Sequence, residues 1–253
     1  MKPMLNFGQS AVRRASKLIL QALDRLESIS MNQAERKKMV EQLRVQSGAE
    51  MIDRLSQAYP GHSIYSPDRA VKKDNTYIWV VEPICGTSNF YHGNYTFVSS
   101  LTLHHRGRPE MAIIYDMLRD EMFSAYLGDG AYLNQRRIRV SPIEELENII
   151  CATDALPARN HLSLDPRQYR ITGCPQLDLA YVAAGKIDAF ISCQENTRGA
   201  SGGCLIIMES GGRISRKEKP SVLIASGAKI HDKLIQEYTK QEKAAQSDEK
   251  PLS

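Results

Sequence analysis

A short segment carries the residues of this sequence that are best suited to chemistry. The apolar run 77–81 is followed by Glu82, and Cys85 comes three residues later. A carboxylate and a thiol could act as acid, base or ligand. Gly86 and Thr87 lie where we expect a helix to begin, so their backbone N–H groups could face an anion. The competing interpretation is that the turn simply needs a glycine at this point.

The cysteines are odd in number, widely spaced and without a CxxC pair, which favours reduced thiols over a disulfide framework. The five are Cys85, Cys151, Cys174, Cys193 and Cys204. One hypothesis is a soft-metal site that combines Cys85 with Cys174 or Cys193. Free cysteines are, however, more often small buried hydrophobic residues.

Size and charge narrow the classes of function. The 253 residues can bury a sizeable core, and the formal charge of +4 is too small and dispersed to indicate nucleic acid. The basic stretch 136–139 is more simply a solvated strand edge. No apolar run approaches the roughly 20 residues of a membrane span. The opening residues lack the layout of a signal peptide, so we expect a cytoplasmic protein.

Helical and strand patterns divide the chain. Apolar residues recur with helical period over 4–28, and a second helix is predicted from Gln33 to Ala58. Alternating runs separated by turn residues then predict an antiparallel sheet. Its strands are expected at 77–81 (ended by Pro83), 97–105, 110–115, 121–126 and 137–140.

The last third alternates helices and strands. These elements are expected at 177–184, 187–191, 202–210, 222–225 and 230–238. We predict one domain over residues 1–240, with the antiparallel sheet in a half of about 1–145 and an α/β half over 146–240. The polar residues 241–253 are expected to form a disordered tail.

Several motifs resemble those of the inositol monophosphatase family, in the same order along the chain. Residues 79–90 are similar to W-x-x-D-P-I-D-G-T-x-N-F, and 128–134 to G-x-G-A-x-x-N. Residues 178–188 are close to the family consensus, and 209–212 follow at the expected distance. The opening residues resemble the bacterial SuhB branch of that family.

The resemblance implies a fold, a site and partners. The fold would be of the α/β (α+β) class, a layered αβαβα sandwich, and the protein a homodimer. In the family, Mg²⁺ held among carboxylates binds a phosphate ester and activates water. The SuhB branch is associated with transcription antitermination, which makes that machinery the expected protein partner. We expect no membrane and no direct nucleic-acid contact.

Carried across residue by residue, the metal positions of the family have lost most of their ligands. Pro67 takes the place of a Glu, and Glu82 and Cys85 take the places of two Asp residues. Gly199 replaces a third Asp, and Arg44 falls where the second helix would supply another. The formal charges of these residues cancel, whereas two cations need a strongly negative site.

The positions that would contact substrate have changed as well. Cys174 and Pro175 replace the family's S/T-A pair, and Pro175 has no N–H to offer. Ser192 takes the place of a Glu that grips an inositol hydroxyl, and Arg198 that of a Trp. Thr87 still matches the family.

We therefore predict a catalytically inactive scaffold or binding protein without a cofactor. The losses concentrate on the site, while the motifs of the scaffold persist. Anion binding by Gly86 and Thr87 would gain positive charge from Arg44 and Arg198. The alternative is a weak Mg²⁺-dependent phosphomonoesterase acting on inositol phosphate or a related sugar phosphate. Its remaining ligands would be Glu82, Asp68, the Ile84 carbonyl and Thr87.

Overall fold

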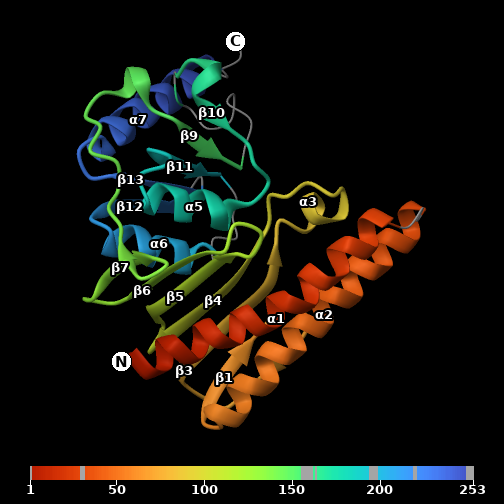
Figure 1. Ribbon diagram of the computed structural model, residues 1–253. Helices are drawn as coiled ribbons and strands as arrows, with labels where there is room; N and C mark the ends of the chain where they lie inside the picture. Colours follow the sequence, from red (N-terminus) through yellow and green to blue (C-terminus); the bar gives the residue numbers. More distant parts are fainter. Residues whose placement is uncertain are drawn as a thin grey trace.

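Helices and sheets alternate in five layers (Figure 1). The computed structural model describes residues 2–28, 32–154, 162, 164–193, 199–218 and 221–248. A helix pair covers one face of the first sheet, a second pair lies between the sheets, and a last helix covers the second sheet. In this order the helices are α1 (Lys2–Ser28), α2 (Gln33–Ala58), α5 (Pro175–Ala183), α6 (Ser201–Glu209) and α7 (His231–Asp248). This arrangement confirms the predicted αβαβα class.

The first sheet has eight strands in the order β2-β1-β3-β4-β5-β6-β7-β8. Its only parallel pair among the described residues is β1 with β3, and the other neighbours are antiparallel. The strands are β1 (His62–Tyr65), β2 (Ala70–Val71), β3 (Asp74–Cys85), β4 (Val98–His105), β5 (Arg108–Asp116), β6 (Glu121–Tyr126), β7 (Gly130–Leu133) and β8 (Arg136–Arg137). The strand predicted over 137–140 is therefore shorter and earlier.

Strand β3 does not end at Pro83, as predicted, but continues to Cys85. The pairing with β4 shifts register between Glu82 and Cys85. A proline without N–H is tolerated at such an irregularity because no ladder hydrogen bond is required of it. Its carbonyl accepts a hydrogen bond from the Ser99 hydroxyl. The irregularity places the side chains of Glu82 and Cys85 close together at the end of the strand.

The second sheet has five strands in the order β10-β9-β11-β13-β12. Its parallel part joins β9 to β10 and β11, and its antiparallel part joins β13 to β11 and β12. The strands are β9 (Cys151–Thr153), β10 (Tyr169–Arg170), β11 (Ala189–Ser192), β12 (Gly212–Glu218) and β13 (Ser221–Gly227). Sequence periodicity missed β9, β10 and β12, which are short or charged.

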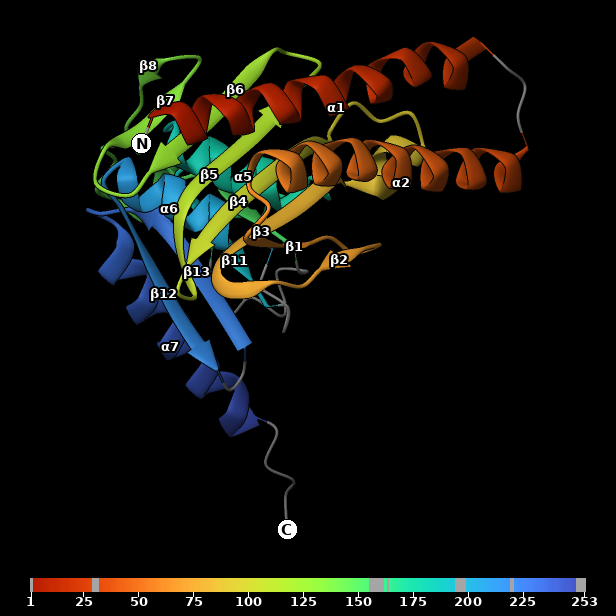
Figure 2. The same ribbon diagram turned by 90° about the horizontal axis from the view of Figure 1, so that it is seen from below.

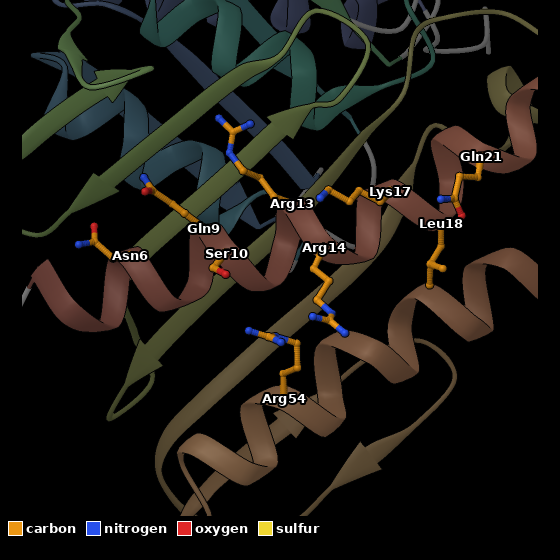
Figure 3. Close-up of a pocket in the computed structure, with 9 residues that line it drawn as sticks. All are labelled: Asn6, Gln9, Ser10, Arg13, Arg14, Lys17, Leu18, Gln21 and Arg54. Atoms are coloured by element: carbon orange, nitrogen blue, oxygen red, sulfur yellow. The ribbon is translucent and has the colours of Figure 1, made fainter.

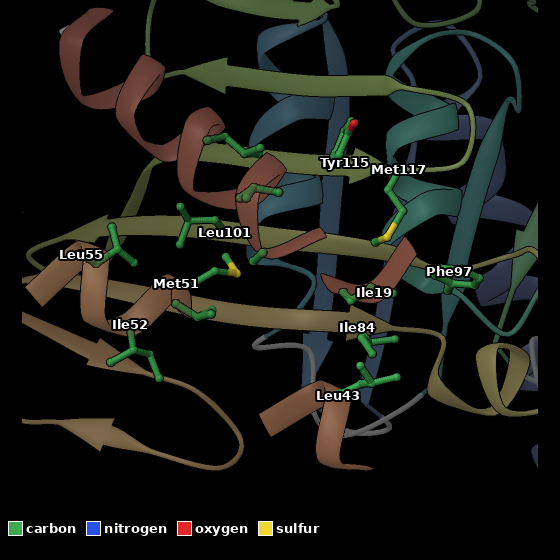
Figure 4. Close-up of a cluster of buried hydrophobic side chains, with 14 of the residues drawn as sticks. Ile19, Leu43, Met51, Ile52, Leu55, Ile84, Phe97, Leu101, Tyr115 and Met117 are labelled. Carbon is green, nitrogen blue, oxygen red and sulfur yellow. The ribbon is translucent and has the colours of Figure 1, made fainter. Parts of the chain in front are cut away.

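The core beneath α1 and α2 joins both helices to the first sheet. Ile19 from α1, Met51 from α2 and Leu101 from β4 are fully buried in one cluster (Figure 4). Helix α2 begins with a capping box, in which Asn32 and Glu35 satisfy each other's backbone N–H groups. None of the helices in the described ranges has the length and apolar character that a bilayer-spanning helix needs.

The predicted disordered tail is wrong for residues 241–248, because α7 continues to Asp248. The helix lies beside β12 and β13, away from α1 and α2 (Figure 2). The Lys217 ammonium on β12 pairs with the buried Glu242 carboxylate at 2.5 Å. This contact across the layers supports a helical turn that the polar sequence does not predict. Residues 249–253 lie outside the described part of the chain.

Candidate functional site

A hollow of about 280 Å³ lies where β3 runs into α3 (Thr87–Tyr91). Helix α2 contributes to its wall, as do the loop after β1 and the end of β3. The lining residues are Arg44, Pro67, Glu82, Pro83, Ile84, Cys85 and Thr87. The fold thus gathers, from three separate segments, most of the positions that match the family's site.

The Glu82 carboxylate is surrounded by neutral hydrogen-bond donors. The Cys85 thiol donates to Glu82 Oε2 at 3.1 Å, and the Ser100 hydroxyl donates to the same oxygen at 3.3 Å. The Gln176 amide reaches it from α5, with Nε2 at 3.2 Å from Oε2. Buried polar groups require such partners. These donors satisfy one oxygen of the carboxylate without a cation.

Gln176 is a site residue that sequence reasoning missed. It lies in the first turn of α5, directly after Pro175, and is only 6% exposed. Its Nε2 also donates to the Gly199 carbonyl. A Cβ on Gly199 would lie 2.8 Å from Glu82 Oε1 and 3.5 Å from Gln176 Nε2. Glu82 and the Gln176 amide therefore both pack against Gly199.

Both thiols at the site donate hydrogen bonds to oxygen atoms. Burial, followed by the nearby charge of Glu82, raises the pKa of Cys85 well above its ordinary value. Burial raises the pKa of Cys174 to about 12, and its thiol donates to the Cys85 carbonyl at 3.5 Å. Cys193 instead lies after β11, where its N–H donates to Asp154. Soft metals bind thiolates, so this arrangement gives the soft-metal hypothesis no support.

Arg44 does not supply free positive charge, which corrects one expectation. Its guanidinium pairs with Asp68 at 2.6 Å and with Glu41 at 2.5 Å, while its side chain is only 18% exposed. Asp68 was expected as a residual metal ligand, but its carboxylate is turned to Arg44 and does not line the hollow. The two groups compensate each other at the rim.

The turn before α3 explains its glycine structurally. Gly86 has φ of 85°, and a Cβ there would lie 2.7 Å from the Thr96 carbonyl oxygen. Both the left-handed backbone and the close contact exclude other residues. Thr87 is exposed at the start of α3. Anion binding by the amides of Gly86 and Thr87 stays a prediction.

The substrate positions have taken structural roles. Pro175 begins α5, where its missing N–H costs nothing. The Ser192 hydroxyl donates to the Asp154 carboxylate. Arg198 lies outside the described residues.

The residues around the hollow do not fit a Mg²⁺ centre. Mg²⁺ demands oxygen ligands at near-octahedral geometry together with negative charge. Here one carboxylate faces the hollow, the Gln176 amide lies beside it, and the Arg44–Asp68 pair closes the rim. Among the described residues, no group of three or more His, Cys, Asp or Glu side chains could hold a metal ion.

Comparison with known proteins assigns the chain to a family. Nus factor SuhB of Pseudomonas aeruginosa is 35% identical over 233 residues, which cover 85% of this chain and 86% of the relative. Nus factor SuhB of Haemophilus influenzae is 32% identical over 240 residues, or 90% of each chain.

Solved structures agree with these relatives. The extragenic suppressor protein suhB of Bartonella henselae has a TM-score of 0.80 at 28% identity and covers 94% of this chain and 99% of its own. Inositol monophosphatase from Anabaena has a TM-score of 0.81 at 25% identity, covering 94% and 96%. A model described as the inositol monophosphatase family matches residues 1–249. The chain belongs to the inositol monophosphatase family.

Proposed function

We propose that this protein is a catalytically inactive member of its family that serves as a scaffold or binding protein of the transcription antitermination machinery. The neutral hydrogen-bond network around Glu82 carries the first half of this proposal. A metal-dependent phosphatase needs that carboxylate free to bind a cation. The similarity to relatives named Nus factor SuhB supports the second half.

The competing function is a weak Mg²⁺-dependent phosphomonoesterase. It is favoured by the hollow, which Glu82, Ile84 and Thr87 still line. A cation there would have to displace the Gln176 amide and the Cys85 thiol from Glu82. One carboxylate would hold at most one Mg²⁺ weakly.

Phosphate release from inositol 1-phosphate distinguishes the two functions. We expect only the background rate with Mg²⁺ at roughly 10 mM, a concentration that loads weak oxygen-ligand sites. Steady release that a chelator abolishes would contradict the inactive-scaffold proposal.

Restoring a single ligand should not restore turnover, because the groups of such a site act as a unit. We expect Cys85→Asp to remain at background, since the Gln176 amide still fills the space beside Glu82. A combined variant restores the missing ligands and also removes the Gln176 amide from beside Glu82. It carries Pro67→Glu, Glu82→Asp, Cys85→Asp, Gly199→Asp and Gln176→Ala. Turnover by Cys85→Asp alone would show that the missing ligands were misassigned.

The binding role is tested by purification from the native host with mass spectrometry of the retained proteins. We expect transcription factors or RNA polymerase to be retained equally by the unaltered chain and by Glu82→Gln, since the role does not use the carboxylate. We further propose that the protein is a homodimer, which light scattering of the purified protein checks. We propose the cytoplasm as its location. Loss of retention in Glu82→Gln would assign the binding to the old site.

A further inference from the structure

The outer surface of the α1–α2 pair carries a hollow of about 700 Å³ that shares no lining residue with the hollow beside Glu82. Arg14 of α1 and Arg54 of α2 face each other across it, while Arg13 lies on the other side of α1 (Figure 3). The remaining lining side chains are mostly amides and hydroxyls. The full set is Asn6, Gln9, Ser10, Arg13, Arg14, Lys17, Leu18, Gln21 and Arg54.

Part of the positive charge in this hollow is uncompensated. Arg13 pairs with Asp120, and Arg14 pairs with Glu50 at 2.7 Å. Among the described residues, neither Lys17 nor Arg54 forms an ion pair. The Arg54 guanidinium lies 5.7 Å from the centre of the Phe7 ring, and its Nε is buried without an acceptor. The hollow therefore carries positive charge at Lys17 and Arg54 that an acidic partner would compensate.

A second hollow of about 300 Å³, polar and apolar in about equal measure, continues from the basic one. The two share Leu18 and Gln21, and Leu18 keeps 38% of its surface exposed. Ala22, Met39 and Leu43 line it together with the amides of Gln42 and Gln46. The α1–α2 groove, defined as these two hollows together, is thus basic at one end, while the other end combines amides with the exposed apolar side chain of Leu18.

We propose that the α1–α2 groove binds an acidic, amphipathic helix of a protein partner. Acidic side chains would meet Lys17 and Arg54, and an apolar side chain would pack on Leu18 in the second hollow. The amides between them can pair with polar groups of either kind. This inference rests on the proposed binding role and supplies the chemistry of its partner.

A single-stranded nucleic acid fits the groove less well. No aromatic side chain lines either hollow, so bases would have no ring to stack on. The mixed character of the groove matches a folded peptide with two kinds of side chain.

The test uses the full chain and a fluorescein-labelled helical peptide of roughly 20 residues, long enough to be helical in isolation, with Glu and Leu on opposite faces. Fluorescence anisotropy measures binding. We expect Lys17→Glu and Leu18→Asp each to weaken it about tenfold, since both act on one groove from its two ends. Both side chains are exposed, so folding should be retained. The matched controls are Lys240→Glu on α7 and Met208→Asp on α6, which are also exposed.

Equal loss of affinity in the controls, or no binding of the peptide, would overturn the proposal. So would tighter binding of a labelled oligouridine whose affinity responds to Lys17→Glu but not to Leu18→Asp. The assay uses neither turnover nor transcription proteins. If the Lys17→Glu and Leu18→Asp variants still retain transcription proteins from the host, the α1–α2 groove is not the binding surface, while the proposed function stands.

Discussion

At the scale of single residues, a hydrogen-bonding amide contacts the Glu82 carboxylate from another layer of the fold. Gln176 Nε2 bridges the Glu82 carboxylate and the Gly199 carbonyl, although Gln176 Oε1 has no partner among the described residues. A hydrogen bond to a charged group contributes about 1.5–3 kcal/mol and one between neutral groups about 1 kcal/mol, and a buried acceptor left without its donor costs about 1–3 kcal/mol. The network around Glu82 therefore stabilises the folded chain.

We expect Gln176→Ala to lower the free energy of unfolding by about 1–3 kcal/mol, because Glu82 and the Gly199 carbonyl both lose a donor. Urea denaturation measures the change, and the exposed Gln46→Ala is the control. The variant should still lack Mg²⁺-dependent turnover, since only one carboxylate is left to bind the metal. Unchanged stability would mean that water or another donor replaces the amide.

Asp178 predicts a dependence of stability on pH. Burial raises the pKa of its carboxyl to about 7, against the hydrogen bond that the Thr172 hydroxyl donates to it. Its ordinary value is about 3.9. Between these values the folded chain keeps a proton that the unfolded chain has lost. The contribution of Asp178 is therefore largest below pH about 4 and declines until pH about 7.

The variant Asp178→Asn should reduce this decline, because the neutral amide does not titrate. Unfolding free energies between pH 4 and 8 measure the slope, and the exposed Asp129→Asn serves as the control. A slope identical to that of the unaltered chain would show that Asp178 is ionised in the fold throughout this range.

At the scale of elements, the turn from β3 into α3 is fixed by its backbone. We expect Gly86→Ala to destabilise the protein by about 1–3 kcal/mol, since Gly86 has positive φ and its neighbour is a carbonyl oxygen. Gly61→Ala is the matched control, because a Cβ there meets no atom within 4 Å. Equal stability of the two variants would show that the fold does not require glycine at position 86, which favours a functional role for Gly86.

The end of α7 also depends on a contact between layers. We expect Glu242→Ala to destabilise the chain by about 1 kcal/mol, because the buried carboxylate pairs with Lys217. Thermal unfolding followed by circular dichroism measures the change, with the exposed Lys243→Ala as control. If both variants unfold alike, the last turns of α7 contribute nothing to stability.

Sequence alone predicts the parts of this fold that depend on local pattern. The helix predicted over Gln33–Ala58 matches α2, because Asn32 and Glu35 form a capping box next to a helical period. The position of Gln176 could not be predicted, since it faces Glu82 from a segment 94 residues away. The same holds for the pairing of Arg44 with Asp68, which depends on where α2 lies over the loop after β1.

At the scale of the whole molecule, α5 and α6 give both sheets a shared core. The cluster around these helices contains Ile114 and Phe123 from the first sheet and Phe190 and Leu223 from the second. If one sheet separated from α5 and α6, the apolar residues that the other sheet packs into the same cluster would also become exposed. We therefore propose that the two sheets form one cooperative domain.

Unfolding in urea should accordingly show a single midpoint for both halves. Trp79 is the only tryptophan and is fully buried in β3, so its fluorescence reports on the first sheet. Pulse-labelling by hydrogen exchange reports on the amides of β11 and β13 in the second. Coincident transitions by independent probes are the mark of a two-state process. If β11 and β13 lose protection at a lower urea concentration than the one that changes Trp79 fluorescence, the halves unfold separately and the single domain is disproved.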